Sequence, residues 1–377
     1  MMSFRLNPSS RILGAEPLAL RILRTGFIER ASITATQDPT KPIILNDEPQ
    51  QWLRCQTSGS SGAPKTIRRN PQSWINSFEI TADLFDVTHK DNYAVFGGLA
   101  HSLTLYACCE ALHLGADICM LDGMSPKSQA ANLLSQQITV IYATPTQLRL
   151  LAKLGNEFSM IKHVFIGGGV LDASLWSALP AIFPSAQIRQ FFGSSETSFI
   201  TITDTLTPVG SVGKAYPDVD LQVRDQNVDG VGEIWVRSAY VFDGYEGSPD
   251  GAQWDGGYLS IGELGALDDH GYLFLHGRKT RMVTVMDQNV FLDAVETVVR
   301  QCTGVTDCAV VAVADAARGH RIVCYVAGDL TLDDIGRHCR AKLAAHAVPK
   351  EIHILMQIPV LPAGKPDLAR LARMAEQ

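Results

Sequence analysis

The alternation of short apolar runs with longer helical patterns is the feature of this chain that most narrows its possible folds. Four apolar runs have the length and composition of buried strands, namely Tyr93–Leu99, Val140–Ala143, His163–Ile166 and Ile188–Phe192. Longer helical patterns such as Ser73–Phe85 and Leu103–Leu114 alternate with these runs. Strands and helices in this order predict a large, layered α/β domain.

The pattern changes twice further along the chain. Between Thr201 and Asp268 it becomes short strands with Gly, Asp and Pro turns, which predicts a small β-rich subdomain. After Gly277-Arg278 a further unit of about one hundred residues begins, within the usual size range of a domain. Its predicted elements are helices at 292–301 and 332–345 and strands at 308–313, 322–326 and 351–356. We therefore predict an α/β core over residues 1–278 and a small α+β domain over residues 279–377.

Size and composition set broad limits on the class of protein. A chain of 377 residues is long enough for a large domain and a smaller one, each with its own core. The formal net charge of -7 and the lack of a long basic run argue against nucleic acid as the main partner. No apolar stretch reaches membrane-spanning length, and the N-terminal region lacks the continuous apolar core of a signal peptide. We therefore expect a cytoplasmic protein that neither crosses a membrane nor binds nucleic acid.

Cysteine and histidine spacing gives no sign of a structural metal site. The eight cysteines show no Cys-x-x-Cys spacing and mostly lie in apolar surroundings, which predicts reduced, buried thiols. The ten histidines form no pair four residues apart with a carboxylate between them. A structural zinc site is therefore not expected.

The segment Thr57–Lys65 has the composition of a phosphate-binding loop. Its glycines allow backbone N–H groups to turn inward around an anion, its hydroxyl side chains add donors, and Lys65 supplies a positive charge. The Walker spacing, four residues between Gly and Gly-Lys, is absent. Taken alone, the segment leaves two interpretations open: a phosphate-binding loop or a flexible Ser/Gly surface turn.

Four further motifs follow in a fixed order. They are Gln190–Thr197, Gly257–Glu263, Gly271–Lys279 and Pro362–Lys365. Together with the loop, they resemble the adenylate-forming superfamily of acyl-CoA synthetases, aryl-acid ligases, peptide-synthetase adenylation domains and luciferases. The resemblance extends from about Trp52 to the C-terminus. It implies ATP-dependent activation of a carboxylic acid through an acyl- or aryl-adenylate, release of pyrophosphate, and transfer of the acyl group to a thiol.

The resemblance also implies roles for the phosphate-binding residues. The loop would close over the β- and γ-phosphates of ATP through Thr57, Ser58, Gly59, Ser60, Ser61, Gly62 and Lys65. Glu196 is the expected Mg²⁺ ligand, since a hard cation prefers carboxylate oxygen. In the same motif Phe192 would stack on adenine, next to Gly193, and Ser195 would contact the α-phosphate. Gly168 and Gly169 resemble the glycine-rich turn beside the adenine, although glycines in isolation indicate only a tight turn.

The remaining motifs imply the ribose contacts and the catalytic lysine. Glu263 stands where the family has an aspartate that binds the ribose hydroxyls, and Arg278 would be the second ribose contact. Lys365 matches the lysine that bridges the substrate carboxylate and the α-phosphate. Relatives rotate the C-terminal domain between two half-reactions, so we expect that domain to be mobile.

Several positions depart from the family pattern. Thr66 follows the loop lysine where relatives usually have glycine, and Thr280 stands at the usual Asp or Lys pivot. Met286-Asp287 replaces a glycine pair. Only 56 residues precede Thr57, fewer than in relatives, so we expect either a reduced N-terminal subdomain or surface supplied by another chain, such as the second copy in a homodimer.

The substrate is only partly constrained by the sequence. His101 matches a family position at the mouth of the acid pocket, and its alternative interpretation is a satisfied core histidine beside a helix start. No aspartate that could bind an α-ammonium group lies between Val95 and Tyr106. We therefore expect a small aryl or short acyl acid. Coenzyme A is the expected acceptor, with carrier-protein phosphopantetheine as the alternative.

Two other functions remain open at this point. A degenerate, non-catalytic nucleotide-binding partner protein is suggested by the short N-terminal region, Glu263 and Thr280. Retention of Lys65, Glu196, Arg278 and Lys365 argues against it. A kinase-like ATPase is disfavoured by the absent Walker spacing.

Overall fold

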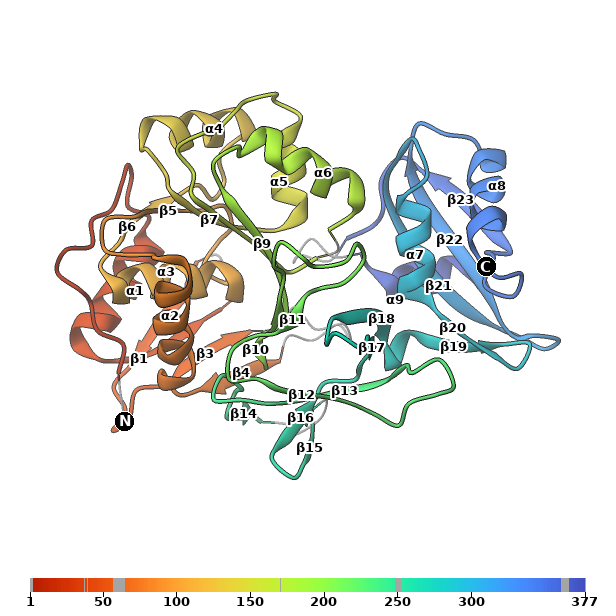
Figure 1. The fold of residues 1–377 in the computed structure, drawn as a ribbon, viewed down its shortest axis with the longest axis horizontal. Helices are drawn as coiled ribbons and strands as arrows, with labels where there is room; N and C mark the ends of the chain where they lie inside the picture. The colour runs from red at the N-terminus through yellow and green to blue at the C-terminus, as the bar shows by residue number, and fades with distance from the viewer. Residues whose placement is uncertain are drawn as a thin grey trace. The chain divides into compact units, whose positions relative to one another are not determined.

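The fold is described from a computed structural model that covers residues 3–36, 38, 40–56, 65–169, 171–247, 252–360 and 366–376 (Figure 1). The chain divides into two compact units. The first contains Met1–Gln222, Trp235–Ile261 and Leu267–Leu273, and the second contains Val223–Ile234, Gly262–Ala266 and Phe274–Gln377. The division of the protein into a core and a mobile domain at residue 278 stays a prediction.

A seven-stranded sheet forms the centre of the first unit. Its strand order is β11-β10-β9-β8-β7-β5-β6. The strands are β5 (Asn92–Val95), β6 (Asp117–Met120), β7 (Val140–Ala143), β8 (His163–Ile166), β9 (Gln187–Ser194), β10 (Ser198–Ile202) and β11 (Lys214–Ala215). The strands from β6 to β9 pair in parallel, whereas β10 and β11 are antiparallel. The sheet therefore has the parallel centre expected for alternating strands and helices.

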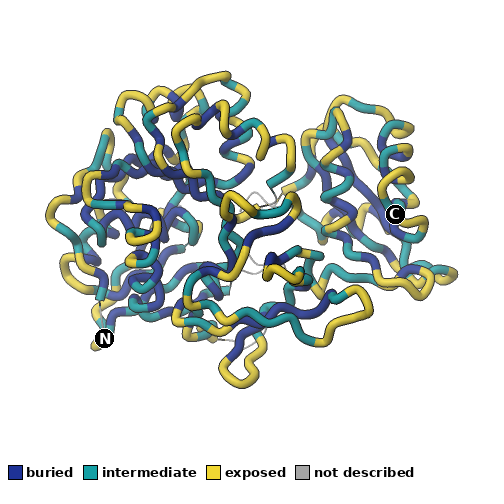
Figure 2. Tube along the Cα trace, in the orientation of Figure 1, coloured by how far each residue is buried: buried dark blue, intermediate teal, exposed yellow. Residues whose placement is uncertain are grey.

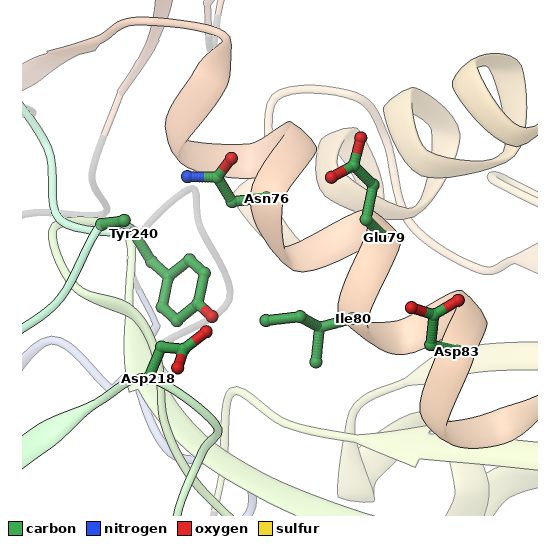
Figure 3. A pocket seen from close by; sticks show the side chains of 7 residues that line it. Asn76, Glu79, Ile80, Asp83, Asp218 and Tyr240 are labelled. Atoms are coloured by element: carbon green, nitrogen blue, oxygen red, sulfur yellow. The ribbon is translucent and has the colours of Figure 1, made fainter.

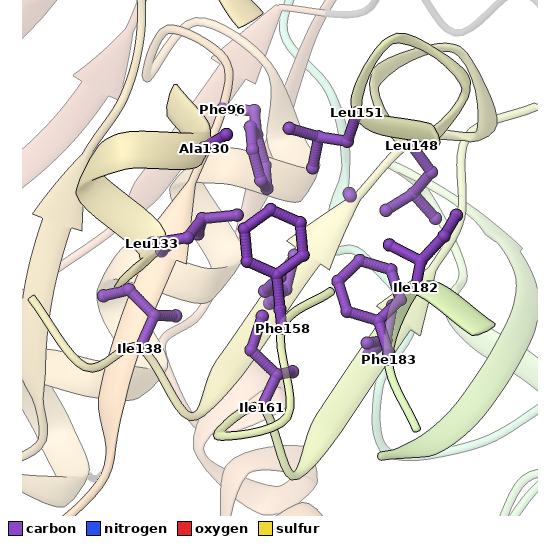
Figure 4. Close-up of a cluster of buried hydrophobic side chains, with 14 of the residues drawn as sticks. Phe96, Ala130, Leu133, Ile138, Leu148, Leu151, Phe158, Ile161, Ile182 and Phe183 are labelled. Carbon is purple, nitrogen blue, oxygen red and sulfur yellow. The ribbon is translucent and has the colours of Figure 1, made fainter. Parts of the chain in front are cut away.

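Helices cover both faces of this sheet. The helices α4 (Pro126–Ser135), α5 (Pro145–Ala152) and α6 (Ala173–Ile182) contribute to an apolar cluster with β5, β7 and β8 (Figure 4). The helices α2 (Gln72–Phe85) and α3 (Ser102–Leu114) pack on each other, and α3 also contacts β5, β6 and β7. Because helices cover both faces of the sheet, the residues of β5 to β8 are mostly buried, whereas many loop residues are exposed (Figure 2).

Local sequence signals explain where several helices begin. Thr144 and Gln147 form a capping box at the start of α5, with a proline at the first helical position. The carboxylate of Asp172 accepts a hydrogen bond from the backbone N–H of Leu175 at 2.9 Å, which caps α6. These caps satisfy backbone donors that would otherwise lack partners in the first helical turn.

A five-stranded sheet in the first unit is formed mainly by strands of the N-terminal region. Its order is β14-β4-β3-β1-β2. The strands are β1 (Ser32–Ala35), β2 (Ile43–Asn46), β3 (Leu53–Gln56), β4 (Thr66–Arg69) and β14 (Gly244–Tyr245), and the helix α1 (Leu18–Glu29) contacts β1 and β2. The predicted phosphate loop thus connects two adjacent antiparallel strands, β3 and β4.

The predicted β-rich segment contributes strands to three sheets. Its strands β10 and β11 belong to the seven-stranded sheet and β14 to the five-stranded sheet. The strand β13 (Gly232–Arg237) pairs with β16 (Tyr258–Ser260) through Val236, and β16 pairs with β15 (Gln253–Asp255). The strand β12 (Asp220–Arg224) also pairs with β13. The pattern of a short apolar strand does not indicate which sheet the strand joins. The sequence therefore could not predict how these strands are shared among the sheets.

The second unit contains a small α+β arrangement, as predicted. A three-stranded sheet is formed by β21 (Val305–Asp315), β22 (Gly319–Gly328) and β23 (Glu351–Leu355). The helices α7 (Leu292–Arg300) and α8 (Leu332–Lys342) share one apolar cluster with it, and α9 (Leu368–Ala375) shares another. Alternate residues of β21 and β22 face the two clusters, which is the period-2 pattern of a strand covered on both faces.

The second unit also includes all but one residue of each of the strands β17 (Glu263–Leu267) and β18 (Leu273–Arg278). It contains the 3₁₀ helix η1 (Lys279–Arg281) and the hairpin of β19 (Met282–Val285) and β20 (Gln288–Phe291). Met286 and Asp287 turn this hairpin with positive φ angles of 52° and 62°. A left-handed turn favours glycine, so this Met-Asp pair adopts the turn at a conformational cost that glycine would not have.

The eight cysteines are free thiols and all are buried, as predicted. Within the described residues, no helix combines the length and the apolar composition that spanning a membrane requires.

Candidate active site

The motif Gln190–Thr197 forms strand β9 and the tight turn that leads into β10. The hydroxyl of Ser194 accepts hydrogen bonds from the backbone N–H groups of Glu196 at 3.1 Å and Thr197 at 3.2 Å. The backbone N–H of Ser194 in turn donates to the Thr197 hydroxyl at 3.0 Å. A Cβ atom on Gly193 would lie 1.7 Å from the carbonyl oxygen of Ser198, so only glycine allows the two strands to approach this closely.

The carboxylate of Glu196 is held by a side chain that the sequence analysis missed. The hydroxyl of Tyr245, on β14, donates to Oε1 of Glu196 at 2.9 Å. Burial, and then the adjacent Glu196 charge, raise the pKa of Tyr245, so the phenol stays protonated and can donate this bond. The backbone N–H of Phe242 donates to the Glu196 carbonyl at 2.8 Å. Glu196 therefore sits in a defined, half-buried position.

Lys65 lies over the ring of the same tyrosine. Its ammonium nitrogen is 5.1 Å from the centroid of the Tyr245 ring, within the range of a cation–π interaction. The structure thus brings together two predicted site residues, Lys65 and Glu196, through Tyr245. The loop residues Thr57, Ser58, Gly59, Ser60, Ser61 and Gly62 lie outside the described residues.

Two neighbouring phenylalanines of β9 have different surroundings. A Cβ atom on Gly167 would lie 2.2 Å from the Phe191 ring, and Phe191 also contacts Phe199 with ring centroids 4.7 Å apart. Because successive strand residues face opposite sides, Phe192 points away from this packing and is half-buried. Gly168 has a positive φ of 75°, as a tight turn requires. Phe192, Gly168 and Gly169 as adenine contacts remain predictions.

His101 lies at the start of α3 and is exposed, which makes the alternative of a satisfied core histidine wrong. A histidine between a glycine pair and an apolar helix resembles a core residue in sequence, yet the N-cap position places it outside the core. The next residue, Ser102, shares a 2.9 Å hydrogen bond between its hydroxyl and that of Ser195. The residues at the start of α3 and the Ser195–Thr197 turn are therefore adjacent within the first unit.

The predicted ribose-binding residues contact each other in the second unit. Nε of Arg278 donates to Oε1 of Glu263 at 3.0 Å, and the backbone N–H of Arg278 donates to Asp293 at 3.1 Å. Glu263 is largely buried on β17, whereas the Arg278 side chain is about half-exposed on β18. A carboxylate held by its neighbouring guanidinium presents its second oxygen in a fixed direction.

Thr280 lies in η1, between residues with several partners. The backbone N–H of Lys279 donates to the Gly262 carbonyl at 2.8 Å, and the Lys279 ammonium donates to Glu233 at 2.9 Å. Arg281 pairs with Asp293 at 2.5 Å and with Glu296. The predicted pivot segment is thus held by charged side chains on either side of Thr280. Lys365 lies outside the described residues, so its catalytic role stays a prediction.

The donors of the first unit fit a magnesium–triphosphate group. A half-buried carboxylate supplies the oxygen that Mg²⁺ prefers, and a lysine close to it supplies a charge for phosphate. In the part of the chain that the structure describes, no three His, Cys, Asp or Glu side chains are grouped to hold a metal. One carboxylate is enough for this role, since Mg²⁺ in phosphoryl-transfer sites is usually held by one or two carboxylates together with phosphate and water.

A separate hollow of about 290 Å³ lies in the first unit (Figure 3). Its lining includes Glu79 and Asp83 of α2 together with Asp218 and Tyr240. It contains none of the predicted site residues, and its three carboxylates would repel a nucleotide.

Comparison with known proteins agrees with this class of fold and site. The sequence profile of the AMP-binding enzyme matches residues 31–246, and that of the AMP-binding enzyme C-terminal domain matches residues 294–365. The chain belongs to the AMP-binding enzyme family. It is an AMP-forming acid–thiol ligase, the class predicted from the motifs.

Two relatives and one solved structure illustrate the match. The chain is 28% identical over 345 residues to the uncharacterized acyl-CoA ligase YhfT of Bacillus subtilis, covering 89% of this chain and 71% of YhfT. It is 30% identical over 330 residues to the putative long chain fatty acid-CoA ligase VraA of Staphylococcus epidermidis, covering 85% and 72%.

The solved structure is o-succinylbenzoate CoA synthetase (MenE) from Bacillus subtilis. With its acyl-adenylate intermediate bound, it superposes with a TM-score of 0.78 at 22% identity, covering 85% of this chain and 68% of MenE. The same enzyme in complex with ATP and magnesium ion gives a TM-score of 0.77. At this identity the likeness shows the fold, which confirms the predicted fold class.

Proposed function

We propose that this protein joins a small aryl or short acyl acid to the thiol of coenzyme A, with Lys65 and Glu196 serving the phosphates and Mg²⁺ of ATP. The observation that carries the proposal is the arrangement of Lys65, Tyr245 and Glu196, which places a cation and an oriented carboxylate beside one phenol. The acyl-adenylate, ATP and magnesium ion in the MenE structures support the same chemistry.

The first half-reaction forms the mixed anhydride. An oxygen of the substrate carboxylate attacks the α-phosphorus of ATP, a P–O bond forms, and the bond from the α-phosphorus to the bridging oxygen of pyrophosphate breaks. Lys65 would neutralise phosphate oxygens and Glu196 would ligate Mg²⁺, which supplies charge neutralisation at the triphosphate. Ser195 would contact the α-phosphate, and Lys365 would bridge it to the acid.

The second half-reaction transfers the acyl group. The sulfur of the acceptor thiol attacks the acyl carbon, the C–S bond forms, and AMP leaves as the C–O bond breaks. Coenzyme A is the proposed acceptor because YhfT and VraA are named as CoA ligases. Carrier-protein phosphopantetheine is the alternative, and a homodimer stays a prediction that sedimentation velocity would test.

The acid class rests on the segment before α3. This segment has no aspartate between Val95 and Tyr106 to bind an α-ammonium group. The exposed position of His101 at the start of α3 is compatible with a role at the entrance of an acid site. We therefore place aryl and short acyl acids ahead of amino acids, with the long-chain acids named for VraA as a further pool to test.

The test is ATP–pyrophosphate exchange with the purified protein and separate pools of aryl, short acyl, long acyl and amino acids. Exchange with an aryl or short acyl pool supports the proposal, and thioester formation with coenzyme A or with a phosphopantetheinylated carrier protein then identifies the acceptor. Exchange with amino acids alone would overturn the acid class. Binding of ATP without exchange in any pool would favour a non-catalytic nucleotide-binding partner.

The Lys365→Ala variant separates the two half-reactions. We expect it to lose adenylate formation by at least about a hundredfold while retaining most of its activity towards a presynthesised acyl-adenylate. Equal loss of both activities would contradict the role of Lys365.

A further inference from the structure

Arg69, the last residue of β4, is a charged side chain in the interior of the first unit. It is 0% exposed to solvent. Isolated buried charges are strongly destabilising unless hydrogen bonds satisfy them, so an arginine in this position needs a structural explanation. None of the roles described above uses it.

The guanidinium of Arg69 donates to both sides of the turn that carries Glu196. One terminal nitrogen, Nη2, donates to the carbonyl oxygen of Ser195 at 2.5 Å, one residue before Glu196. The other, Nη1, donates to the hydroxyl of Ser198 at 2.8 Å, two residues after it. The same nitrogen also donates to the Tyr240 carbonyl at 3.0 Å and the Ser73 hydroxyl at 3.2 Å.

Ser198 is the residue on which several of these interactions meet. Its backbone has a φ of 56°, in the left-handed region that non-glycine residues rarely adopt. Its hydroxyl accepts from Arg69 and from Nε1 of Trp74 at 3.0 Å, and it donates to the Tyr240 carbonyl at 3.1 Å. The Arg69 guanidinium also lies 5.1 Å from the Trp74 ring centroid. This network compensates the unfavourable backbone angle at the end of the turn.

The Arg69 side chain also keeps its positive charge, which strengthens its hold on the turn. Burial lowers the pKa of Arg69 to about 10, while the nearby charges, Glu196 among them, raise it. Arg69 therefore remains a cation at neutral pH. Its hydrogen bonds to the turn are therefore charge-assisted, which makes them stronger than bonds between neutral groups.

We propose that Arg69 is a positioning residue that fixes the Ser195–Ser198 turn and so directs the Glu196 carboxylate towards magnesium. The inference rests on the proposed function of Glu196. Arg69 acts on the carboxylate through the turn, because its bonds to the Ser195 carbonyl and the Ser198 hydroxyl flank Glu196. Its bonds to the Tyr240 carbonyl and the Ser73 hydroxyl hold the guanidinium itself in place.

The test uses the whole protein and measures the gain in affinity for α,β-methylene-ATP when EDTA is replaced by Mg²⁺, by titration calorimetry. Arg69→Lys keeps the charge but loses the planar fork of donors. Arg68→Lys is the matched control, because Arg68 is the preceding residue of β4 and its guanidinium lies over the Trp52 ring at 4.6 Å. Glu196→Gln and the Arg69→Lys/Glu196→Gln double variant complete a cycle.

We expect Arg69→Lys to reduce the magnesium-dependent gain about tenfold, the scale found when groups that orient metal ligands are changed. Arg68→Lys should leave the gain unchanged. The double variant should lose no more than Glu196→Gln alone, because both changes act on one carboxylate. A full gain in folded Arg69→Lys, or additive losses in the double variant, would overturn the inference.

Ser198→Ala tests the same network should Arg69→Lys fail to fold. It removes only the hydroxyl that Arg69 and Trp74 share, so we expect a reduction of a few-fold in the magnesium-dependent gain. An unchanged gain would overturn the inference. If the unmodified protein binds the analogue equally with and without Mg²⁺, the role of Glu196 fails, and the role of Arg69 fails with it.

Discussion

The two faces of the seven-stranded sheet are built in different ways. Towards α4, α5 and α6, the strands present Ala94, Ile141 and Val164, which join a cluster made of apolar side chains (Figure 4). The neighbouring residues Tyr93 and Tyr142 face the other way and donate their hydroxyls to Glu110 of α3 at 3.0 and 2.7 Å. The face covered by α4, α5 and α6 is held mainly by apolar packing. The face covered by α3 combines packing with hydrogen bonds to a buried carboxyl group.

The difference extends to the candidate site. On the polar face, Tyr106 joins Glu110 to the Ser77 hydroxyl of α2, and Trp74 of the same helix donates to Ser198 beside the Glu196 turn. The helices α2 and α3 thus connect a buried carboxyl group to the turn that carries the expected magnesium ligand. We infer that the apolar face mainly stabilises the fold, whereas the polar face also determines the geometry of the site.

Phe158→Ala, on the apolar face, should give the largest effect among tests of this difference between the two faces. Phe158 is 0% exposed and stacks on Phe183 with ring centroids 5.7 Å apart. Loss of its ring should leave a cavity and lower the free energy of unfolding by about 3–5 kcal/mol. Urea unfolding measures the loss, and pyrophosphate exchange per folded molecule should be unchanged.

Leu134→Ala is the matched control for this change, since Leu134 lies on α4 with 41% of its surface exposed. It should cost less than about 1 kcal/mol. A large loss of exchange activity in folded Phe158→Ala would contradict the division of roles between the two faces.

Glu110→Gln tests the polar face through pH. Burial raises the pKa of Glu110 to about 8, although its tyrosine hydrogen bonds act to lower it. The folded state therefore retains a proton that the unfolded chain loses near the ordinary pKa of 4.5. The stability contributed by this proton is fully present below pH 4.5 and is lost as the pH rises towards 8.

Glutamine does not titrate. The free energy of unfolding of the variant, relative to that of the unmodified protein, should therefore rise between pH 4.5 and pH 8, by a few kcal/mol at most. Thermal unfolding from pH 4.5 to 8.5 measures the difference. Glu79→Gln, at an exposed position of α2, is the carboxyl-to-amide control. Parallel pH profiles for Glu110→Gln and the unmodified protein would contradict the raised pKa.

Tyr245→Phe tests the hydrogen bond to Glu196. Without the phenol hydroxyl the carboxylate loses a donor that orients it, so we expect kcat/KM for pyrophosphate exchange to fall about tenfold with little change in stability. Tyr272→Phe is the matched control, because Tyr272 also donates to a carboxylate, Asp204, at 3.4 Å. Equal effects of the two substitutions would show that the tyrosine bond to Glu196 has no special role.

Ser102→Ala should give the smallest effect. It removes the hydroxyl bonded to Ser195 and should lower exchange activity only a few-fold, in line with about 1 kcal/mol for one hydrogen bond between neutral groups. Ser177→Ala on α6, which removes a hydroxyl bonded to the Ala173 carbonyl, should leave exchange activity intact. A loss as large as that of Tyr245→Phe would assign Ser102 a direct role.

The sequence predicted the order of elements well where the hydrophobic pattern was strong. The strands Val140–Ala143 and His163–Ile166 begin and end where their apolar runs do. The run Tyr93–Leu99 was predicted too long, because the strand ends at Val95. Apolar residues beyond the end of a strand can be buried without hydrogen bonding to a neighbouring strand. An apolar run therefore does not show where the strand ends.

The contacts around Glu196 were not predictable from local patterns. Tyr245 and Arg69 come from strands 49 and 127 residues away in the chain. The two strands lie side by side, since β14 pairs with β4. The motif predicts Glu196 as the magnesium ligand, which stays a prediction, whereas tertiary pairing determines which residues hold Glu196. Glu110 carries no motif at all, and its role follows only from the tyrosines that surround it.

The eight buried cysteines have a chemical consequence for an enzyme that makes a reactive acyl phosphate anhydride. Such an intermediate acylates thiolates, and a thiolate of the protein itself would compete with the intended acceptor. Cys55, whose charge would interact with Arg69 and Glu196, is fully buried, and burial raises its pKa to about 12. Its sulfur remains a thiol at neutral pH and is shielded from small molecules. We therefore expect Cys55 to resist acylation by the enzyme's own intermediate.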